Sequence, residues 1–88
     1  MSHFKRILSQ ILAGKSDANI AFNDLCNLLI HMGFEERTKG SHHIFRKSGI
    51  DEKIIIQKDQ NKAKPYQVKQ VRNMFIKYKL GDNINEQI

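Results

Sequence analysis

The sequence predicts a single α+β domain in which two helices precede a three-stranded antiparallel sheet and a third helix follows it. Apolar residues recur at helical spacing up to residue 33, then alternate with polar residues between 34 and 57, and a proline at position 65 opens another helical stretch. Helices that flank an antiparallel meander can both pack on one face of the sheet, which leaves the other face exposed. A chain of 88 residues supports one thin core.

The first two helices are predicted from apolar stripes that end at glycines. Phe4–Leu12 has apolar residues three and four apart, and Gly14 suits the stop of that helix. Lys15–Asn19 is polar and is expected to be a connector. The next helix starts near Phe22 and ends at Gly33. Its stripe should face the core and consists of Phe22, Leu25, Cys26, Leu28, Leu29 and Met32.

Three strands are expected after Gly33. Phe34–Arg37 is the first, Lys39–Ser41 forms a turn, and His42–Arg46 alternates as the second strand. Ser48-Gly49 is a tight-turn signal, which predicts a hairpin to the third strand, Lys53–Gln57.

The last helix is expected to follow a seven-residue polar loop, Lys58–Lys64. Pro65 suits its first turn, where a missing N–H costs nothing, and Gly81 should stop it. Its buried stripe is expected to be Val68, Val71, Met74 or Phe75, and Tyr78. Within the single domain 1–88, residues 1–19 would form the N-terminal helix and connector, 20–80 the core, and 81–88 a frayed tail.

The balance of charge predicts an anionic partner. The chain carries 15 Lys and Arg against 9 Asp and Glu, a net charge of +6. The excess is concentrated in residues 34–80, which hold 12 basic and 5 acidic side chains. Nucleic acid is the commonest partner of such a surface.

Several classes of protein are not expected. The one cysteine, Cys26, cannot form an intramolecular disulfide, and the histidines do not have zinc-finger spacing, so no metal and no cofactor are predicted. Cys26 is most simply a small core residue. No apolar run is long enough for a membrane span, and the first residues do not form a signal peptide, so we expect a reduced, cytoplasmic protein.

The segment from Lys39 to Phe45 contains the best candidate for chemistry. A Gly-Ser turn leads into a strand with two histidines, followed by Arg46 and Lys47. A histidine can take or give a proton at neutral pH, and in cationic surroundings it would suit metal-free RNA cleavage. From spacing alone, the simpler explanation is that one ring packs partly buried and the other lies in solvent. Strand alternation places His42 with Arg46 and His43 with Phe45, which makes His42 the first choice and His43 the second.

A second basic cluster lies at the start of the last helix. It could form a phosphate track, although a solvated lysine face is as good an explanation, and Tyr66 beside it could stack on a base or pack. Including the residues near His42, the candidates for RNA contact are Ser41, Arg46, Lys47, Lys62, Lys64, Lys69 and Arg72.

From about Phe22 to Leu80 the chain resembles the HicA family of small bacterial toxins. The likeness lies in Met32-Gly33-Phe34, the Lys39–Phe45 segment, Ile54–Gln57 and the run Lys62–Arg72. It implies a double-stranded-RNA-binding-domain-like fold, an mRNA interferase activity and a HicB-type antitoxin as partner. In that family the histidine after Gly-Ser is catalytic, which corresponds to His42. The N-terminal helix and the 58–64 loop depart from the shortest members.

These observations lead to one expected function and two alternatives. The expected function is an RNA-cleaving toxin that acts on mRNA without a metal, is monomeric when alone and is blocked by its antitoxin. A double-stranded-RNA-type module that binds RNA without cutting it is the first alternative. The second is a protein-interaction subunit whose charge steers it to an acidic surface.

Overall fold

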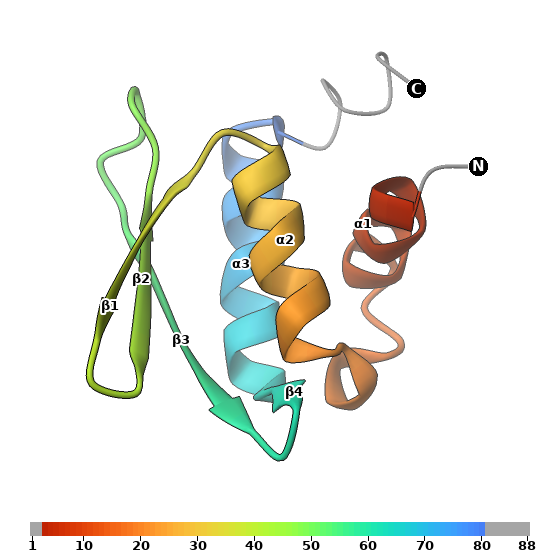
Figure 1. Cartoon of the computed structure of the whole chain (residues 1–88). Helices are drawn as coiled ribbons and strands as arrows, with labels where there is room; N and C mark the ends of the chain where they lie inside the picture. The colour runs from red at the N-terminus through yellow and green to blue at the C-terminus, as the bar shows by residue number, and fades with distance from the viewer. Residues whose placement is uncertain (1–2, 81–88) are drawn as a thin grey trace.

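The structure is a computed structural model and describes residues 3–80 (Figure 1). The expectations for Gly81 and for the tail 81–88 lie outside these residues. The helices and strands in chain order are α1 (His3–Ala13), the 3₁₀ turn η1 (Asp17–Asn19), α2 (Phe22–His31), β1 (Glu35–Lys39), β2 (His42–Arg46), β3 (Ile54–Asp59), β4 (Lys62–Ala63) and α3 (Pro65–Lys77).

The elements form three layers. The antiparallel sheet, with strand order β1-β2-β3-β4, lies on one side, α2 and α3 form the middle layer, and α1 lies beyond them (Figure 1). The order α2-β1-β2-β3-α3 is compatible with a double-stranded-RNA-binding-domain-like fold, with α1 added at the N-terminus. The predicted α+β class is therefore confirmed. No helix within residues 3–80 has the length and apolar character needed to cross a membrane.

The core lies between the middle helices and the sheet, as the apolar stripes predict. Leu25, Leu28 and Leu29 of α2 are completely buried, and so are Val68 and Val71 of α3. From the sheet, the core receives Phe45, Ile54 and Ile56. Burial of these side chains supplies most of the stability of so small a domain.

Helix α1 covers the side of α2 and α3 that faces away from the sheet. It buries Ile7, Leu8 and Ile11. The ring of Phe4 stacks on His31 at the end of α2, with centroids 4.2 Å apart. The N-terminal helix is thus part of the folded core.

The expected number of strands was wrong by one. The stretch Lys58–Lys64, predicted to be a loop, contains the end of β3, a two-residue turn and the short strand β4. Gln60 and Asn61 in this turn have φ values of 50° and 72°. Positive φ at both central residues is the geometry of a tight hairpin turn, which usually carries glycine. The sequence here lacks that signal.

Other boundaries also differ from the prediction. Strand β1 runs from Glu35 to Lys39 instead of from Phe34 to Arg37, so Lys39 lies in the strand and not in the turn. Ser48-Gly49 does not join β2 to β3 as a tight hairpin, because residues 47–53 form a longer connection in which the N–H of Ile50 donates to the carbonyl of Lys47. Helix α3 ends at Lys77, before Gly81, and Lys79 has a φ of 54°. The left-handed residue that follows this helix is therefore a lysine.

Candidate functional site

Strand β2 directs its two histidines to opposite faces of the sheet. His42 is exposed, whereas His43 is partly buried and faces α2 together with Phe45. This agrees with the alternation expected from the sequence. The outer face and the helix-facing side of the sheet therefore form two separate environments.

His42 lies in an open hollow of about 390 Å³ between the sheet and the first turns of α3. Strands β2 and β3 and the residue before β3 form one wall, and α3 forms the other. The lining side chains are His42, Lys53, Ile55, Gln57, Tyr66, Gln67 and Gln70. Tyr66 is 58% exposed, so its ring is available for stacking against a planar ligand.

A buried glutamine fixes α3 against the sheet at this hollow. Strand β4 pairs with the end of β3, at Lys58 and Asp59, so the preceding part of β3 can meet the helix directly. Gln67 is 2% exposed, and its Oε1 accepts hydrogen bonds from the backbone N–H of Gln57 at 3.2 Å and of Lys64 at 3.4 Å. Gln67 therefore holds the start of α3 beside β3.

The Gly-Ser turn is connected to the same wall. The amide nitrogen Nε2 of Gln57 donates to Oγ of Ser41 at 3.0 Å. Gln57 is also the direct partner of His42 across the β2–β3 pair. Ser41 thus helps to position the turn from which His42 emerges, and its hydroxyl oxygen already accepts one hydrogen bond.

Four lysines flank the hollow or its α3 wall. Lys39 is the direct partner of His42 across the β1–β2 pair, and Lys53 lines the hollow itself. Lys64 immediately precedes α3, and Lys69 is exposed three residues after Tyr66, on the same side of the helix. Lys39 and Lys53 were not among the expected contact residues. Alternation along the strand could have placed Lys53 on the same face as Ile55 and Gln57, but three successive isoleucines obscure that pattern.

Arg46 and Lys47, two expected partners of His42, lie far from it at the other end of β2. Arg46 is four residues further on, which at about 3.3 Å per residue separates the two Cα atoms by about 13 Å. Lys47 lies beyond Arg46, and its Nζ is close to Gly33, just after the end of α2, where a Cβ would come within 2.5 Å of it. A positive charge at the C-terminal end of α2 interacts favourably with the dipole of that helix. Neither residue shares the hollow with His42.

Lys62 and Arg72 make contacts on the other side of α3. Nζ of Lys62 donates to Oδ1 of Asn19 at 3.2 Å. Nη1 of Arg72 donates to Asp17 at 2.8 Å and to the carbonyl oxygen of Ile11, and only 16% of the arginine side chain is exposed. Arg72 therefore links α3 to α1 and η1, and its guanidinium does not belong to the candidate RNA surface.

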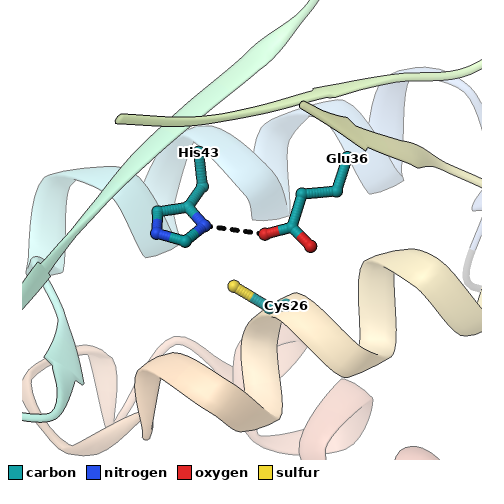
Figure 2. Close-up of side chains that lie close together, drawn as sticks. All are labelled: Cys26, Glu36 and His43. Carbon is teal, nitrogen blue, oxygen red and sulfur yellow. Dashed lines mark hydrogen bonds and ion pairs between the residues drawn. The ribbon is translucent and has the colours of Figure 1, made fainter. Parts of the chain in front are cut away.

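On the helix-facing side, His43 belongs to a second cluster, which Figure 2 shows in close-up. Its Nδ1 lies 2.7 Å from Oε2 of Glu36 in β1, and its ring meets the edge of Phe22 with centroids 4.8 Å apart. Cys26 of α2 points toward both polar groups. Burial, and secondarily the negative charge of Glu36, raises the pKa of the Cys26 thiol to about 12.

Sequence reasoning did not group these three residues. Cys26 was expected in the core and is buried, but its polar neighbours were not foreseen. Glu36 pairs with Phe45 across the β1–β2 ladder, so it shares the face that Phe45 buries. The β1–β2 register would have shown from the sequence that Glu36 lies on the helix-facing side. That register depends on the position of the turn at Gly40-Ser41.

Comparison with known proteins identifies the family. Searches among the curated proteins and among the solved structures gave no match. A family model described as the HicA toxin of bacterial toxin-antitoxin systems matches residues 22–78, which span α2 through α3 and include the whole sheet. A toxin role with an antitoxin partner follows from this match. The chain belongs to the HicA toxin family.

Proposed function

We propose that this toxin is an mRNA interferase that cleaves RNA at the hollow beside His42. The observation that carries the proposal is an exposed histidine in an open hollow that Lys53 also lines, with Lys39 as the cross-strand partner of the histidine. A polyanion can enter such a site, and the imidazole can exchange protons near neutral pH. Family membership supports the toxin role, and the hollow beside His42 supports RNA cleavage as the activity of the toxin.

The proposed reaction is attack of a ribose 2′-hydroxyl on the adjacent phosphorus. His42 takes the hydroxyl proton as general base, the new P–O bond forms a 2′,3′-cyclic phosphate, and the bond to the 5′ oxygen of the next nucleotide breaks. His42 is then an imidazolium, and it returns this proton as general acid to the leaving 5′ oxygen. Lys39, the direct cross-strand partner of His42, and Lys53, which lines the same hollow, would stabilise the charge that develops on the phosphate oxygens.

The substrate is proposed to be single-stranded at the point of cleavage. A base could then stack on the exposed ring of Tyr66 while Lys64 and Lys69 contact neighbouring phosphates. We propose that the toxin is monomeric when alone, acts in the cytoplasm, where mRNA is available, and is blocked by a HicB-type antitoxin. The chemistry needs no metal ion.

Single-turnover RNA cleavage by His42→Ala tests the proposal. Loss of the general base should lower the rate by about 10²–10⁴. The melting temperature should stay close to that of the wild type, because the ring is exposed. The matched control is His3→Ala, an exposed histidine on α1, which should cleave at the wild-type rate. Wild-type cleavage should also persist in EDTA.

Three results would contradict the proposed metal-free RNA cleavage by His42. Full activity of His42→Ala with loss in His43→Ala would move the role to the helix-facing cluster. RNA binding without cleavage by the wild type would favour the non-catalytic RNA-binding module. Loss of cleavage on chelation, in protein that circular dichroism shows to be still folded, would exclude a metal-free mechanism.

A further inference from the structure

Three side chains with metal-ligand atoms converge on the helix-facing side of the sheet. Cys26 comes from α2, Glu36 from β1 and His43 from β2, and one ligand atom of each lies within 4.8 Å of the other two (Figure 2). None of the three lines the hollow at His42. We propose that this cluster binds a divalent transition-metal ion, and that Zn²⁺ is the ion that it fits best.

The donor set is the reason for choosing zinc. Thiolate, imidazole and carboxylate are the three side-chain groups that zinc uses, and a site with three protein ligands leaves the fourth tetrahedral position to water. Calcium and magnesium prefer oxygen ligands alone, so the sulfur and nitrogen here select against them. The side chains of His43 and Glu36 are 26% and 27% exposed, which gives an ion a path into the cluster.

The geometry requires only small movements. Ligand bonds of about 2.0 Å to nitrogen and oxygen and about 2.3 Å to sulfur place tetrahedral ligand atoms about 3.3–3.6 Å apart. The 2.7 Å contact between His43 and Glu36 would therefore open slightly, and the sulfur would move closer. Glu36 can adjust through its flexible side chain, while Phe22 against the imidazole limits rotation of the His43 ring.

Metal binding would also change the electrostatics of the cluster. Without an ion, a buried thiol lies beside a carboxylate, and both burial and that negative charge disfavour the thiolate. An ion with two positive charges between them would favour the thiolate and the carboxylate together. The thiol releases its proton on binding, and the imidazole carries its proton on Nε2 when Nδ1 faces the ion.

The position of the cluster suggests a structural role for the ion. All five residues of β1 are exposed, and among residues 3–80 β1 is an edge strand whose sheet neighbour is β2. A shared ion would bind Glu36 of this edge strand to Cys26 of α2, and so attach the β1–β2 hairpin to the helical layer. Because this role does not involve His42, it is independent of the proposed RNA cleavage.

Titration of the full, tag-free chain with CoCl₂ tests the site. We expect one Co²⁺ per chain, with a thiolate-to-cobalt charge-transfer band in the near ultraviolet that one equivalent of Zn²⁺ abolishes. Zinc at a hundredfold excess over its Kd should raise the melting temperature by more than about 10 °C. Cys26→Ser should remove the band, and Glu36→Gln should weaken cobalt binding by at least about tenfold. His42→Ala is the matched control and should keep the band and the stoichiometry, because its ring lies on the other face of the sheet.

The outcomes that overturn the proposal are equally specific. It is wrong if the wild type shows no charge-transfer band at millimolar cobalt, or if the band survives in folded Cys26→Ser. Circular dichroism of the metal-free variants checks the fold. If Cys26→Ser does not fold, Glu36→Gln decides, since this side chain is partly exposed and the substitution keeps its size, and an unchanged cobalt affinity in that variant rejects the site.

Discussion

His42 and His43 are adjacent in β2, yet their rings lie on opposite sides of the sheet. The ring of His42 lines the hollow beside α3, whereas Nδ1 of His43 lies 2.7 Å from Oε2 of Glu36 on the side of α2. Variants at these two positions should therefore affect different properties. The RNA-cleavage test at His42 and the metal-binding test at Cys26 can fail independently of each other.

RNA affinity should depend steeply on salt. If Lys39, Lys53, Lys64 and Lys69 each contact a phosphate, log K should fall with log salt with a slope of about −3, at about −0.7 per contact for single strands. Binding is best measured in the His42→Ala background, so that the RNA stays intact. An affinity that does not change with salt would contradict a nucleic-acid surface and favour the protein-interaction alternative.

Loss of one proposed phosphate contact should change this slope measurably. Lys69→Ala should weaken binding to all RNA sequences alike and reduce the slope by about 0.7, because phosphate contacts do not distinguish bases. The control is Lys15→Ala, an exposed lysine between α1 and η1, which should keep the wild-type slope. Equal effects of the two substitutions would mean that net charge alone determines the binding.

Arg72 should affect stability and leave RNA binding unchanged. Its guanidinium donates to Asp17 and to a backbone carbonyl, so Arg72→Ala should lower the free energy of unfolding by about 1–3 kcal/mol. A double-mutant cycle with Asp17→Ala should show a coupling of about 1 kcal/mol or more. The measurements are urea unfolding and RNA binding. A large loss of affinity with unchanged stability would restore Arg72 to the RNA surface.

The apolar stripe of α2 should be the part of the core where a large-to-small substitution lowers the free energy of unfolding most. Leu29 is completely buried, so Leu29→Ala should cost about 2–5 kcal/mol, out of a total of about 5–8 kcal/mol expected for so small a domain. Its neighbour Ile30 is 48% exposed, and Ile30→Ala should cost less than about 1 kcal/mol. Urea unfolding measures both variants. Similar losses for the two would contradict the burial of this helix face.

Cys26 should make the metal-free protein less stable in alkali. Its pKa is raised from 9.0 to about 12 in the folded chain, so below pH 9 the thiol is neutral in both the folded and the unfolded state. Between pH 9 and 12 the unfolded chain loses the proton first, and stability falls by up to about 1.4 kcal/mol per pH unit. Cys26→Ser lacks this contribution. Parallel stability profiles of wild type and Cys26→Ser over this range would contradict the shift.

The sequence alone determined the features that depend on local periodicity. Apolar residues at helical spacing are sufficient to place α1, α2 and α3 and to identify buried residues such as Leu29 and Val71. Pro65 determined where α3 begins, because its fixed φ and missing N–H suit a first helical turn. Alternation along β2 separated His42 from His43, since successive side chains of a strand point to opposite faces.

Only the tertiary structure decided which distant residues meet. Cys26 and Glu36 come together because α2 packs against the β1–β2 hairpin, and Arg72 reaches Asp17 because η1 packs against α3. These contacts join residues far apart in the chain, so they depend on packing and strand register, which no local pattern encodes. The short strand β4 is also a feature that only the tertiary structure decided. Its turn holds Gln60 and Asn61 at positive φ, which residues other than glycine seldom adopt, and the carbonyl of Asn61 accepts a hydrogen bond from the N–H of Phe22 in α2.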